Sequence, residues 1–431
     1  MPETRTTPHL KVIQEADIDD KVVLIRVDHN VVKRGQIEDP FRIDSTLGTL
    51  FHIASRGGRP ILMTHVGRPR DKKTGKINCS PNSSVDPLVA YLEEKLRIKI
   101  EAPAFSIQPD LGITTIDSSI QESIQRLKER KIGAIYLPNV RWFQGEQTYG
   151  PERTRFAEQL SGIADIFVND AFGSWQPDVS TFDITGYLPS YAGFLMQQEI
   201  KNLEKVLDPA RPFLAIVAGA KYDTKIGPLK ELYQRVDHLI LGGVIYNAFL
   251  SAQFGVEIAG VPEEDVDLAL ELVRLDKEKN KIVRLPLLVE SENFGERKQG
   301  KTKTVAIKDF RKGDRYNYIL DAGPDAFHEK PVVDIIKSAK TIFVNAVMGL
   351  TPHFYDGSRA LYEAIDENHR ALKLYGGGDT LQELKNLCPG TYMRGLNNPD
   401  CYYFTGGGTV LKALEEGSPF KIKPVEPLVR R

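Results

Sequence analysis

Short apolar runs alternate with segments of helical spacing along almost the whole chain, and no other feature constrains the fold as strongly. The apolar runs are rich in Val, Ile and Leu and cover residues 22–27, 60–63, 134–137, 163–168, 213–217, 238–241, 341–344, 372–375 and 402–404. The helical segments cover residues 43–55, 85–96, 118–130, 153–161, 224–236, 263–275, 332–339, 358–366 and 380–387. Continuous apolar runs of this length are typical of parallel strands that are buried on both faces. The sequence therefore predicts an α/β fold with parallel sheets.

The chain has 431 residues, which is more than one hydrophobic core usually organises, so we expect two domains. A helical run over residues 191–207 ends in Asp-Pro-Ala-Arg-Pro, and proline after a helix is a stop signal. We place the boundary near Leu207, with one domain over residues 1–207 and the other over residues 208–416. The tail 417–431 has three prolines and little periodicity, so we expect it to lie extended on a surface that the N-terminal half could provide.

Composition excludes several classes of protein. Hydrophobic residues make up 41% and charged residues 27%, as in an average soluble domain, so disordered, collagen-like and coiled-coil readings lose their support. A formal net charge of -1 gives no global attraction to nucleic acid or to a membrane surface. The three cysteines fit neither a disulfide framework nor a zinc site. With no apolar leader and no run of about 18 apolar residues, we expect a cytoplasmic protein.

The second half repeats one motif, in which an apolar strand is followed by glycines and then by a helix. It occurs over residues 215–221, 239–244, 374–380 and 403–409. Glycines let a phosphate approach the backbone, and a helix N-terminus offers unpaired N–H groups and a partial positive charge. A single instance is weak because α/β folds need glycine at turns in any case. Four instances in one half favour phosphate binding.

Three charged residues stand beside these turns. Asp379 sits where a helix would begin, either as an N-cap or as a carboxylate that holds Mg²⁺ on nucleotide phosphates. The neighbouring glycine triplet favours the second reading. Lys221 and Lys225 are four residues apart, so on a helix they share one face. They are either solvated or a clamp on a transferring phosphoryl group.

The first half places basic and polar side chains where apolar runs end, and carboxyl ends of parallel strands are where α/β sheets bind ligands. The residues are Arg26, Asp28, Asn30, Arg42, His65, Arg68 and Arg141. Any single arginine is more often part of a surface ion pair. Several that converge suggest a small polyanionic substrate, because the guanidinium fork matches carboxylate and phosphate.

One motif match is set aside. Residues 295–302 fit the phosphate-loop expression G-x-x-x-x-G-K-[ST] letter for letter. That loop works only between a strand and a helix, whereas here the following residues read as a strand and no strand clearly precedes. We expect a solvent-exposed loop.

The sequence has no Ser-His-Asp order, no H-E-x-x-H motif and no metal-ligand cysteine spacing. A carboxylate acceptor of a phosphoryl group is already ionised at neutral pH and needs no general base. Catalysis of such a transfer rests on positioning and on charge stabilisation by Lys, Arg and Mg²⁺.

Taken in order, ten segments resemble the phosphoglycerate kinase family over nearly the whole chain. They are RVDHN (26–30), DPFRI (39–43), MTHVGRP (63–69), NVRWF (139–143), VNDAFGS (168–174), AGFLMQQEI (192–200), PFLAIVAGAKYDTKI (212–226), DAGP (321–324), GGGDT (376–380) and TGGGT (405–409). The resemblance implies two Rossmann-like domains joined by a hinge helix. The first would hold phosphoglycerate and the second the magnesium nucleotide, with domain closure bringing them together in a monomer.

The resemblance also assigns roles to residues. It implies that 3-phosphoglycerate is held by Arg26, Asp28, Asn30, Arg42, His65, Arg68 and Arg141. It implies that ATP or ADP is held by Gly219, Lys221, Lys225, Gly242, Asn345, Gly376, Gly377, Gly378, Asp379 and Thr380, with Asp379 also carrying Mg²⁺ through the nucleotide. The catalytic groups it implies are Arg42, Lys225, Gly378 and Gly408.

The chain departs from the family pattern at both sites. Gln176 and Pro177 stand where the family has a His-Arg pair, and His29 replaces an aromatic residue. Losing one charged hydrogen bond at Pro177 costs about 1.5–3 kcal/mol. On the nucleotide side, residues 345–349 read Asn-Ala-Val-Met-Gly instead of N-G-P-x-G. Pro352 replaces an acidic residue, and Phe404 replaces a serine.

Three hypotheses follow. The leading one is a phosphoglycerate kinase, which transfers a phosphoryl group reversibly between ATP and the carboxylate of 3-phosphoglycerate in glycolysis or gluconeogenesis. The second is a divergent paralogue that phosphorylates another carboxylate, with the altered loop at Gln176 and Pro177 admitting a different distal group. The third is a non-catalytic nucleotide-binding protein on the same scaffold, against which the intact catalytic residues count.

Overall fold

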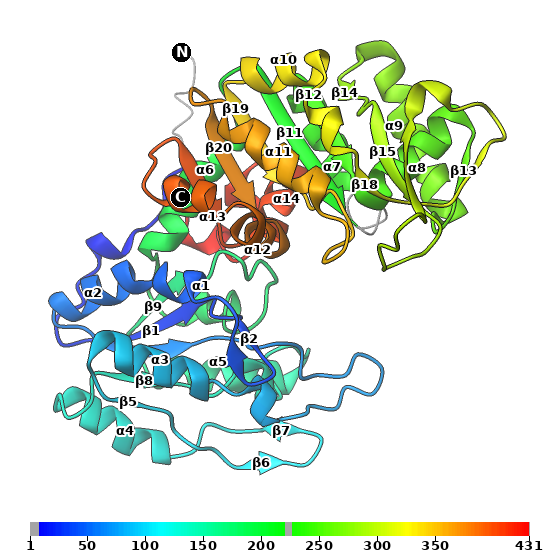
Figure 1. The fold of residues 1–431 in the computed structure, drawn as a ribbon. Coiled ribbons are helices and arrows are strands. Elements are labelled where there is room, and N and C mark those ends of the chain that lie inside the picture. Colours follow the sequence, from blue (N-terminus) through cyan, green and yellow to red (C-terminus); the bar gives the residue numbers. More distant parts are fainter. Residues whose placement is uncertain (1–7, 220–225, 431) are drawn as a thin grey trace, which may run out of the picture. The chain divides into compact units, whose positions relative to one another are not determined.

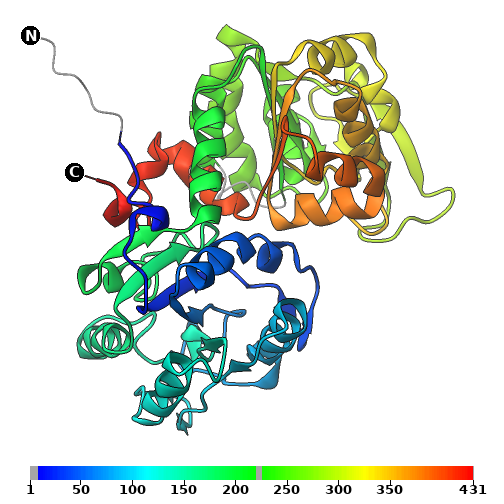
Figure 2. The same ribbon diagram turned by 90° about the vertical axis from the view of Figure 1, so that its left-hand side faces the viewer.

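The computed structural model describes residues 8–219 and 226–430, drawn as a coloured ribbon in Figure 1. The chain divides into two compact units. The first consists of residues up to Lys201 together with Phe420–Arg431, and the second of Asn202–Pro419. The division falls inside one continuous helix, α6 (Phe194–Leu207), which is seen in green in Figure 2.

The first unit is built on a six-stranded parallel sheet with the order β10-β9-β1-β4-β8-β5. Its strands are β1 (Val22–Val27), β4 (Arg59–Met63), β5 (Ile100–Glu101), β8 (Ala134–Tyr136), β9 (Ile166–Asp170) and β10 (Ser190–Ala192). Its helices are α1 (Phe41–Asp44), α2 (Leu47–Ser55), α3 (Asp86–Leu96), α4 (Ser119–Lys128) and α5 (Pro151–Ser161). Two small hairpins, β2 (Val32–Lys33) with β3 (Gln36–Ile37) and β6 (Ile107–Gln108) with β7 (Gly112–Ile113), lie outside this sheet.

Successive residues of β1 enter opposite halves of the core. Val23 and Ile25 pack in the cluster that includes residues of α2 and α3. Val22 and Leu24 pack in the cluster that includes residues of α4 and α5. Because side chains alternate across a strand, a strand covered on both faces must be apolar throughout. This is why β1 reads as a continuous apolar run.

The second unit repeats this architecture with a parallel sheet of order β14-β12-β11-β19-β20-β21. Its strands are β11 (Phe213–Gly219), β12 (His238–Gly242), β14 (Ile282–Val283), β19 (Thr341–Asn345), β20 (Leu372–Gly376) and β21 (Cys401–Phe404). Its helices are α7 (Ile226–Arg235), α8 (Gly243–Phe254), α9 (Glu263–Lys279), α10 (Lys330–Ser338), α11 (Asp356–Asp366), α12 (Gly378–Leu387), α13 (Pro389–Leu396) and α14 (Gly407–Glu416). The predicted α/β fold with two parallel sheets is confirmed.

An antiparallel sheet was not predicted. It contains β16 (Thr302–Ala306), β15 (Leu287–Ser291) and β18 (Tyr318–Ala322) in that order, and a short parallel pair joins β13 (Glu257–Ile258) to β17 (Arg315–Tyr316). The motif match at residues 295–302 follows β15 and ends on the first residue of β16, so a strand and not a helix comes after it, and it is not a phosphate loop. A strand does precede it, which the sequence reading missed.

The C-terminal segment belongs to the first unit. The backbone N–H of Lys11 donates to the carbonyl of Leu428 at 2.7 Å, and the Asn169 side-chain amide donates to the carbonyl of Pro424 at 3.3 Å. Leu428 is fully buried. The tail is not extended throughout, because it forms two 3-10 turns, Pro419–Lys421 and Glu426–Leu428.

Two further findings concern the whole of the described chain. All three cysteines, Cys79, Cys388 and Cys401, are free thiols. In the parts of the chain that the structure describes, no helix combines the length and the apolar character that crossing a membrane requires.

Candidate active site

Arg26 is the centre of a buried polar cluster in the first unit. It lies on β1, next to the last residue of the strand, and is only 1% exposed. Its guanidinium donates to Val27 O at 2.6 Å and to Ser180 Oγ at 2.9 Å, and its Nη2 lies 2.9 Å from Nδ1 of His65. A buried guanidinium requires such partners, because an unpaired one would cost several kcal/mol.

His65 follows β4, the neighbour of β1, and its surroundings hold it neutral. Burial lowers its pKa well below the usual 6.5, and the charges of Arg141, Arg26, Arg42 and Arg68 lower it further. Arginine can only donate, so Nδ1 of His65 must accept the hydrogen bond from Arg26. The ring proton is therefore on Nε2, which makes His65 a neutral donor for an anion.

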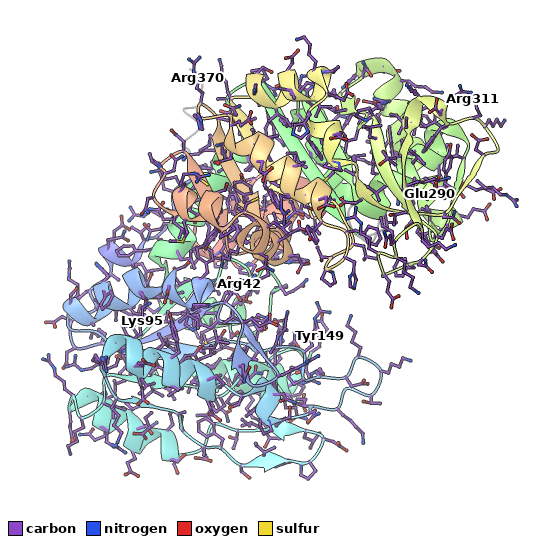
Figure 3. The ribbon with its side chains drawn as sticks, in the orientation of Figure 1. Arg42, Lys95, Tyr149, Glu290, Arg311 and Arg370 are labelled. Atoms are coloured by element: carbon purple, nitrogen blue, oxygen red, sulfur yellow. The ribbon has the colours of Figure 1, made fainter. Side chains whose placement is uncertain are left out.

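Arg42 is held by one carboxylate while part of its side chain stays accessible. It lies on the short helix α1 and is labelled in Figure 3. Its Nη1 lies 3.3 Å from Oδ2 of Asp28, a buried residue just after β1. The Arg42 side chain keeps 24% of its exposure, so the ion pair orients the guanidinium without enclosing it.

The turn that follows His65 is fixed from two sides. The side-chain oxygen of Asn30 accepts a hydrogen bond from Gly67 N at 2.9 Å. Nη1 of Arg141, in the 3-10 helix η3 (Val140–Trp142), donates to Gly67 O at 2.7 Å. Arg68 follows in this turn and is exposed. All seven acceptor-side residues named from the sequence therefore lie at or just beyond the carboxyl end of the first sheet.

Three residues of this cluster were not found from the sequence. Glu146 is fully buried and accepts from the hydroxyl of Ser180 at 2.6 Å and from its backbone N–H at 3.0 Å. Asp178 places Oδ2 3.9 Å from Nη2 of Arg141. Glu146, Asp178 and Ser180 come from loops that lack periodicity. Because Glu146 and Ser180 are 34 residues apart, no local sequence pattern predicts their contact.

At the positions of the missing His-Arg pair, Gln176 and Pro177 are exposed. The Pro177 carbonyl accepts from Nη2 of Arg153 at 2.6 Å, and that arginine also binds Asp183. Arg153 therefore fixes the loop, while Pro177 itself presents neither a charge nor a donor.

In the second unit the glycine turns lie at the carboxyl ends of adjacent strands. Asn345, the last residue of β19, donates to Gly376 O at 2.6 Å. Gly377 has φ of +110°, a conformation that L side chains rarely adopt. A Cβ on Gly407 would come within 2.5 Å of the Gly377 backbone nitrogen. Glycine is therefore required at both positions, because the two turns pack backbone against backbone.

Two helices begin at these turns. Helix α12 begins at Gly378 with Gly377 as its N-cap, and α14 begins at Gly407 with Gly406 as its N-cap. Glycine has no side chain to accept from the first helical N–H groups, which leaves their donors for another acceptor. Gly378 is exposed with no heavy atom near a Cβ built on it, and Gly408 is also exposed.

Asp379 is the second residue of α12 and is exposed. The N-cap is Gly377, so the alternative reading of Asp379 as an N-cap is wrong. Thr380 is buried behind it. A single exposed carboxylate at a helix N-terminus is what a protein usually contributes to a Mg²⁺ site, since this ion keeps several waters and binds substrate phosphates. The residues present therefore fit a magnesium nucleotide.

Two more of the predicted glycine turns follow β11 and β12, whose last residues are Gly219 and Gly242. Gly219 forms an isolated bridge with Gly243. Gly242 lies against Met348, since a Cβ there would come within 2.7 Å of the Met348 sulfur. Gly242, Asn247 and Met348 help to line a small space of about 10 Å³. Lys221 and Lys225 lie outside the described residues.

Comparison with known protein families shows which family has this chain as a member. The sequence model of the family described as phosphoglycerate kinase matches residues 13–417. The chain belongs to the phosphoglycerate kinase family. It is therefore a kinase that uses a nucleotide.

Individual relatives agree with the family match. The chain is 33% identical to a phosphoglycerate kinase of Dictyoglomus turgidum over 413 residues, which is 94% of this chain and 95% of that protein. It is 32% identical to a phosphoglycerate kinase of Trichodesmium erythraeum over the same shares. The phosphoglycerate kinase structure from Coxiella burnetii has a TM-score of 0.74 at 26% identity and covers 97% of this chain and 99% of its own. The Pyrococcus horikoshii structure, at 21% identity and a TM-score of 0.74 over 97% of this chain and 98% of its own, shows the same fold.

Proposed function

We propose that this kinase transfers a phosphoryl group reversibly between MgATP and the carboxylate of 3-phosphoglycerate, which gives ADP and 1,3-bisphosphoglycerate. The observation that carries the proposal is the buried cluster in which Arg26 is bonded to a neutral His65. Several guanidinium groups and one imidazole donor converge around it, and such a set suits a small molecule with two anionic ends.

On the acceptor side, we assign binding of the phosphate end to His65, Arg68 and Arg141. Nε2 of His65 would donate without adding a charge, because burial and the surrounding arginines lower the pKa of the ring well below its usual value. Asp28 fixes Arg42 at 3.3 Å, and Arg42 is assigned to the oxygens of the transferring group. Asn30 acts indirectly, since it holds the backbone at Gly67.

On the nucleotide side, we assign the phosphates to the open turn at Gly376, Gly377 and Gly378 and to the N-terminus of α12. The N–H groups at Gly378 and Gly408 would face the group in transfer, and Gly219 and Gly242 would lie along the nucleoside. Asp379 would hold Mg²⁺ on the nucleotide, where the ion neutralises phosphate charge. Lys221 and Lys225 are assigned to the same phosphates.

The chemistry then needs no general base. The carboxylate of the acceptor has a pKa of about 4 and is ionised at neutral pH. The attacking oxygen therefore carries no proton to remove, which agrees with the unprotonated Nδ1 of His65 being occupied by the hydrogen bond from Arg26. The contribution of the protein is alignment and compensation of charge on the transferred group.

One observation favours a second candidate function. Pro177 offers no contact where the family has an arginine, and Asp178 brings a negative charge to Arg141. A site with less positive charge suits a carboxylate whose distal group is less anionic than a phosphate. The second candidate is therefore phosphorylation of such a carboxylate by the same set of transfer groups.

The test measures ADP formation from MgATP with 3-phosphoglycerate and, separately, with D-glycerate, which lacks the phosphate. Lys225→Ala serves as the blank, and Arg42→Ala is compared with Arg56→Ala, an exposed arginine of the same unit. We expect turnover with 3-phosphoglycerate, abolished in the blank and lowered about 10²- to 10³-fold in Arg42→Ala only. Faster turnover with glycerate supports the second candidate. Nucleotide binding without turnover on either acceptor contradicts both.

A further inference from the structure

Asp178 brings a carboxylate to the side chains that we assign to the acceptor. We call these side chains the acceptor cluster: Arg26, Arg42, His65, Arg68 and Arg141. It stands in the loop between β9 and η4 (Asp183–Gly186), and its side chain is only 14% exposed. One carboxylate oxygen lies 3.9 Å from Nη2 of Arg141 and accepts from the Gln147 side-chain amide at 3.2 Å. The other terminal nitrogen of Arg141, Nη1, donates a hydrogen bond to Gly67 O. Of the two terminal nitrogens, Nη2, which faces Asp178, is therefore the one that remains for an anionic ligand.

A second carboxylate, that of Glu146, lies close enough to interact with Asp178. Glu146 is tied to Ser180, and the Ser180 hydroxyl also accepts from Nε of Arg26. The link runs from the Glu146 carboxylate through one hydroxyl to the guanidinium next to His65. Asp178 thus faces Arg141 directly, whereas Glu146 is linked to Arg26 through Ser180.

Charged groups face this pair from every element around it. Arg26 comes from β1, Arg141 from η3 and Arg153 from α5. Arg68, after β4, acts on Arg141, and Asp183 in η4 pairs with Arg153. Burial and, to a smaller extent, the Asp178 charge raise the pKa of Glu146 to about 8, against the opposing effects of Arg26 and of the hydrogen bonds from Ser180. Burial also raises the pKa of Asp178, against the opposing effect of Arg141 and Arg26.

An anion that reaches Arg141 changes this balance. It competes with Asp178 for the same guanidinium nitrogen and adds negative charge beside two carboxylates that are already poorly solvated. Both effects favour the protonated form of the pair, as a like charge does for any carboxyl group. Binding of the anion and binding of a proton therefore favour each other, and linkage requires the coupling to be reciprocal.

We propose that Asp178 is a positioning residue that occupies Arg141 in the empty site and, with Glu146, takes up a proton from solvent when the distal anionic group of the acceptor binds. The identity of that acceptor rests on the proposed function, whereas the coupling rests on the cluster alone. Acceptor affinity should then rise as the pH falls from 8.5 to 7.

The test is calorimetric titration of the full chain with 3-phosphoglycerate in buffers of different protonation enthalpy, which counts the protons bound. Wild type is compared with Asp178→Asn and with Asp17→Asn, an exposed residue of the same unit. The substituted amide can still accept from Gln147, and thermal unfolding checks each variant. Protons exchanged by the ligand itself are common to all three proteins and cancel in the comparison.

We expect Asp178→Asn to bind fewer protons than wild type and to bind 3-phosphoglycerate about two- to fivefold more tightly at pH 8.5, because a competing ion pair is removed. Equal proton counts in the two proteins, or weaker binding by Asp178→Asn at every pH, overturn the proposal. If Asp178→Asn does not fold, Asp178→Ala replaces it.

Inorganic phosphate, titrated in the same way, separates this inference from the proposed function. Phosphate binding with proton uptake that depends on Asp178, without any binding of 3-phosphoglycerate, rejects the acceptor and supports the coupling. Binding of neither anion overturns the coupling, because the cluster would then not be an anion site.

Discussion

Nη2 of Arg26 lies 2.9 Å from Nδ1 of His65, and both side chains are buried at the ends of neighbouring strands of the first sheet. This contact fixes the tautomer of the imidazole, because a guanidinium only donates. It also keeps a second positive charge away from Arg26. Nε2–H of His65 is therefore a hydrogen-bond donor without a positive charge.

His65 is predicted to remain neutral between pH 5.5 and 8, because burial and the nearby arginines lower its pKa well below 6.5. Nitrogen chemical shifts of the imidazole, assigned with a His65→Gln variant, should show Nε2–H throughout this range. His328, which is exposed, serves as an internal comparison for solvent access. A midpoint for His65 near 6.5, or a proton on Nδ1, contradicts the arrangement.

Gly378→Ala should separate nucleotide binding from folding. Nothing lies within 4 Å of a Cβ at this position, and the residue opens α12, so stability should be unchanged or slightly raised. The methyl group would nevertheless enter the space assigned to the phosphates, and we expect KM for MgATP to rise about tenfold or more.

Its matched control is Gly186→Ala in the first unit, where a Cβ also meets nothing within 4 Å. This variant should leave KM for MgATP unchanged. Steady-state kinetics and thermal unfolding of both variants check the prediction. An unchanged KM in Gly378→Ala would show that the turn does not receive the phosphates.

Asp170 gives a prediction about stability and pH. Burial raises its pKa to about 7, although its carboxylate accepts from the backbone N–H of Met196. The native state therefore keeps a proton that the unfolded chain loses near pH 4. Its contribution to stability is fully present below that pH and is lost as the pH rises through 7.

Asp170→Asn should remove this part of the pH dependence. Between pH 5 and 8 the free energy of unfolding of wild type should fall more than that of the variant, by on the order of 1–3 kcal/mol. Urea unfolding at both pH values measures the difference. Equal pH dependence in the two proteins would mean that Asp170 is ionised in the folded state.

The parts of the fold that were predicted are those whose burial leaves a recognisable sequence pattern, either a short apolar run or an amphipathic helical period. Strands such as β1 and β11 are covered on both faces and read as apolar runs. Helix α8 was missed because it is buried on nearly all sides from Ile245 to Ser251, so it lacks an amphipathic period. The segment 43–55 was predicted as one helix but is divided into α1 and α2 at Ser45 and Thr46.

In the candidate site, the residues at strand ends were predictable from the sequence, and the residues in loops were not. Arg26 and His65 could be named because the end of a parallel strand is a position that a sequence reveals. Glu146, Asp178 and Ser180 could not, because loops with no periodicity bring them together. The N-cap of α12 also depended on backbone geometry, since φ of +110° places Gly377 outside the helix and Asp379 inside it.

Transfer of the phosphoryl group to the carboxylate of 3-phosphoglycerate can be measured by trapping the acyl phosphate product. The purified chain is incubated with MgATP, 3-phosphoglycerate and hydroxylamine, which converts an acyl phosphate into a hydroxamate. We expect hydroxamate in proportion to ADP, and none with Lys225→Ala. ADP formed without hydroxamate, or no ADP although MgATP binds, would contradict this expectation.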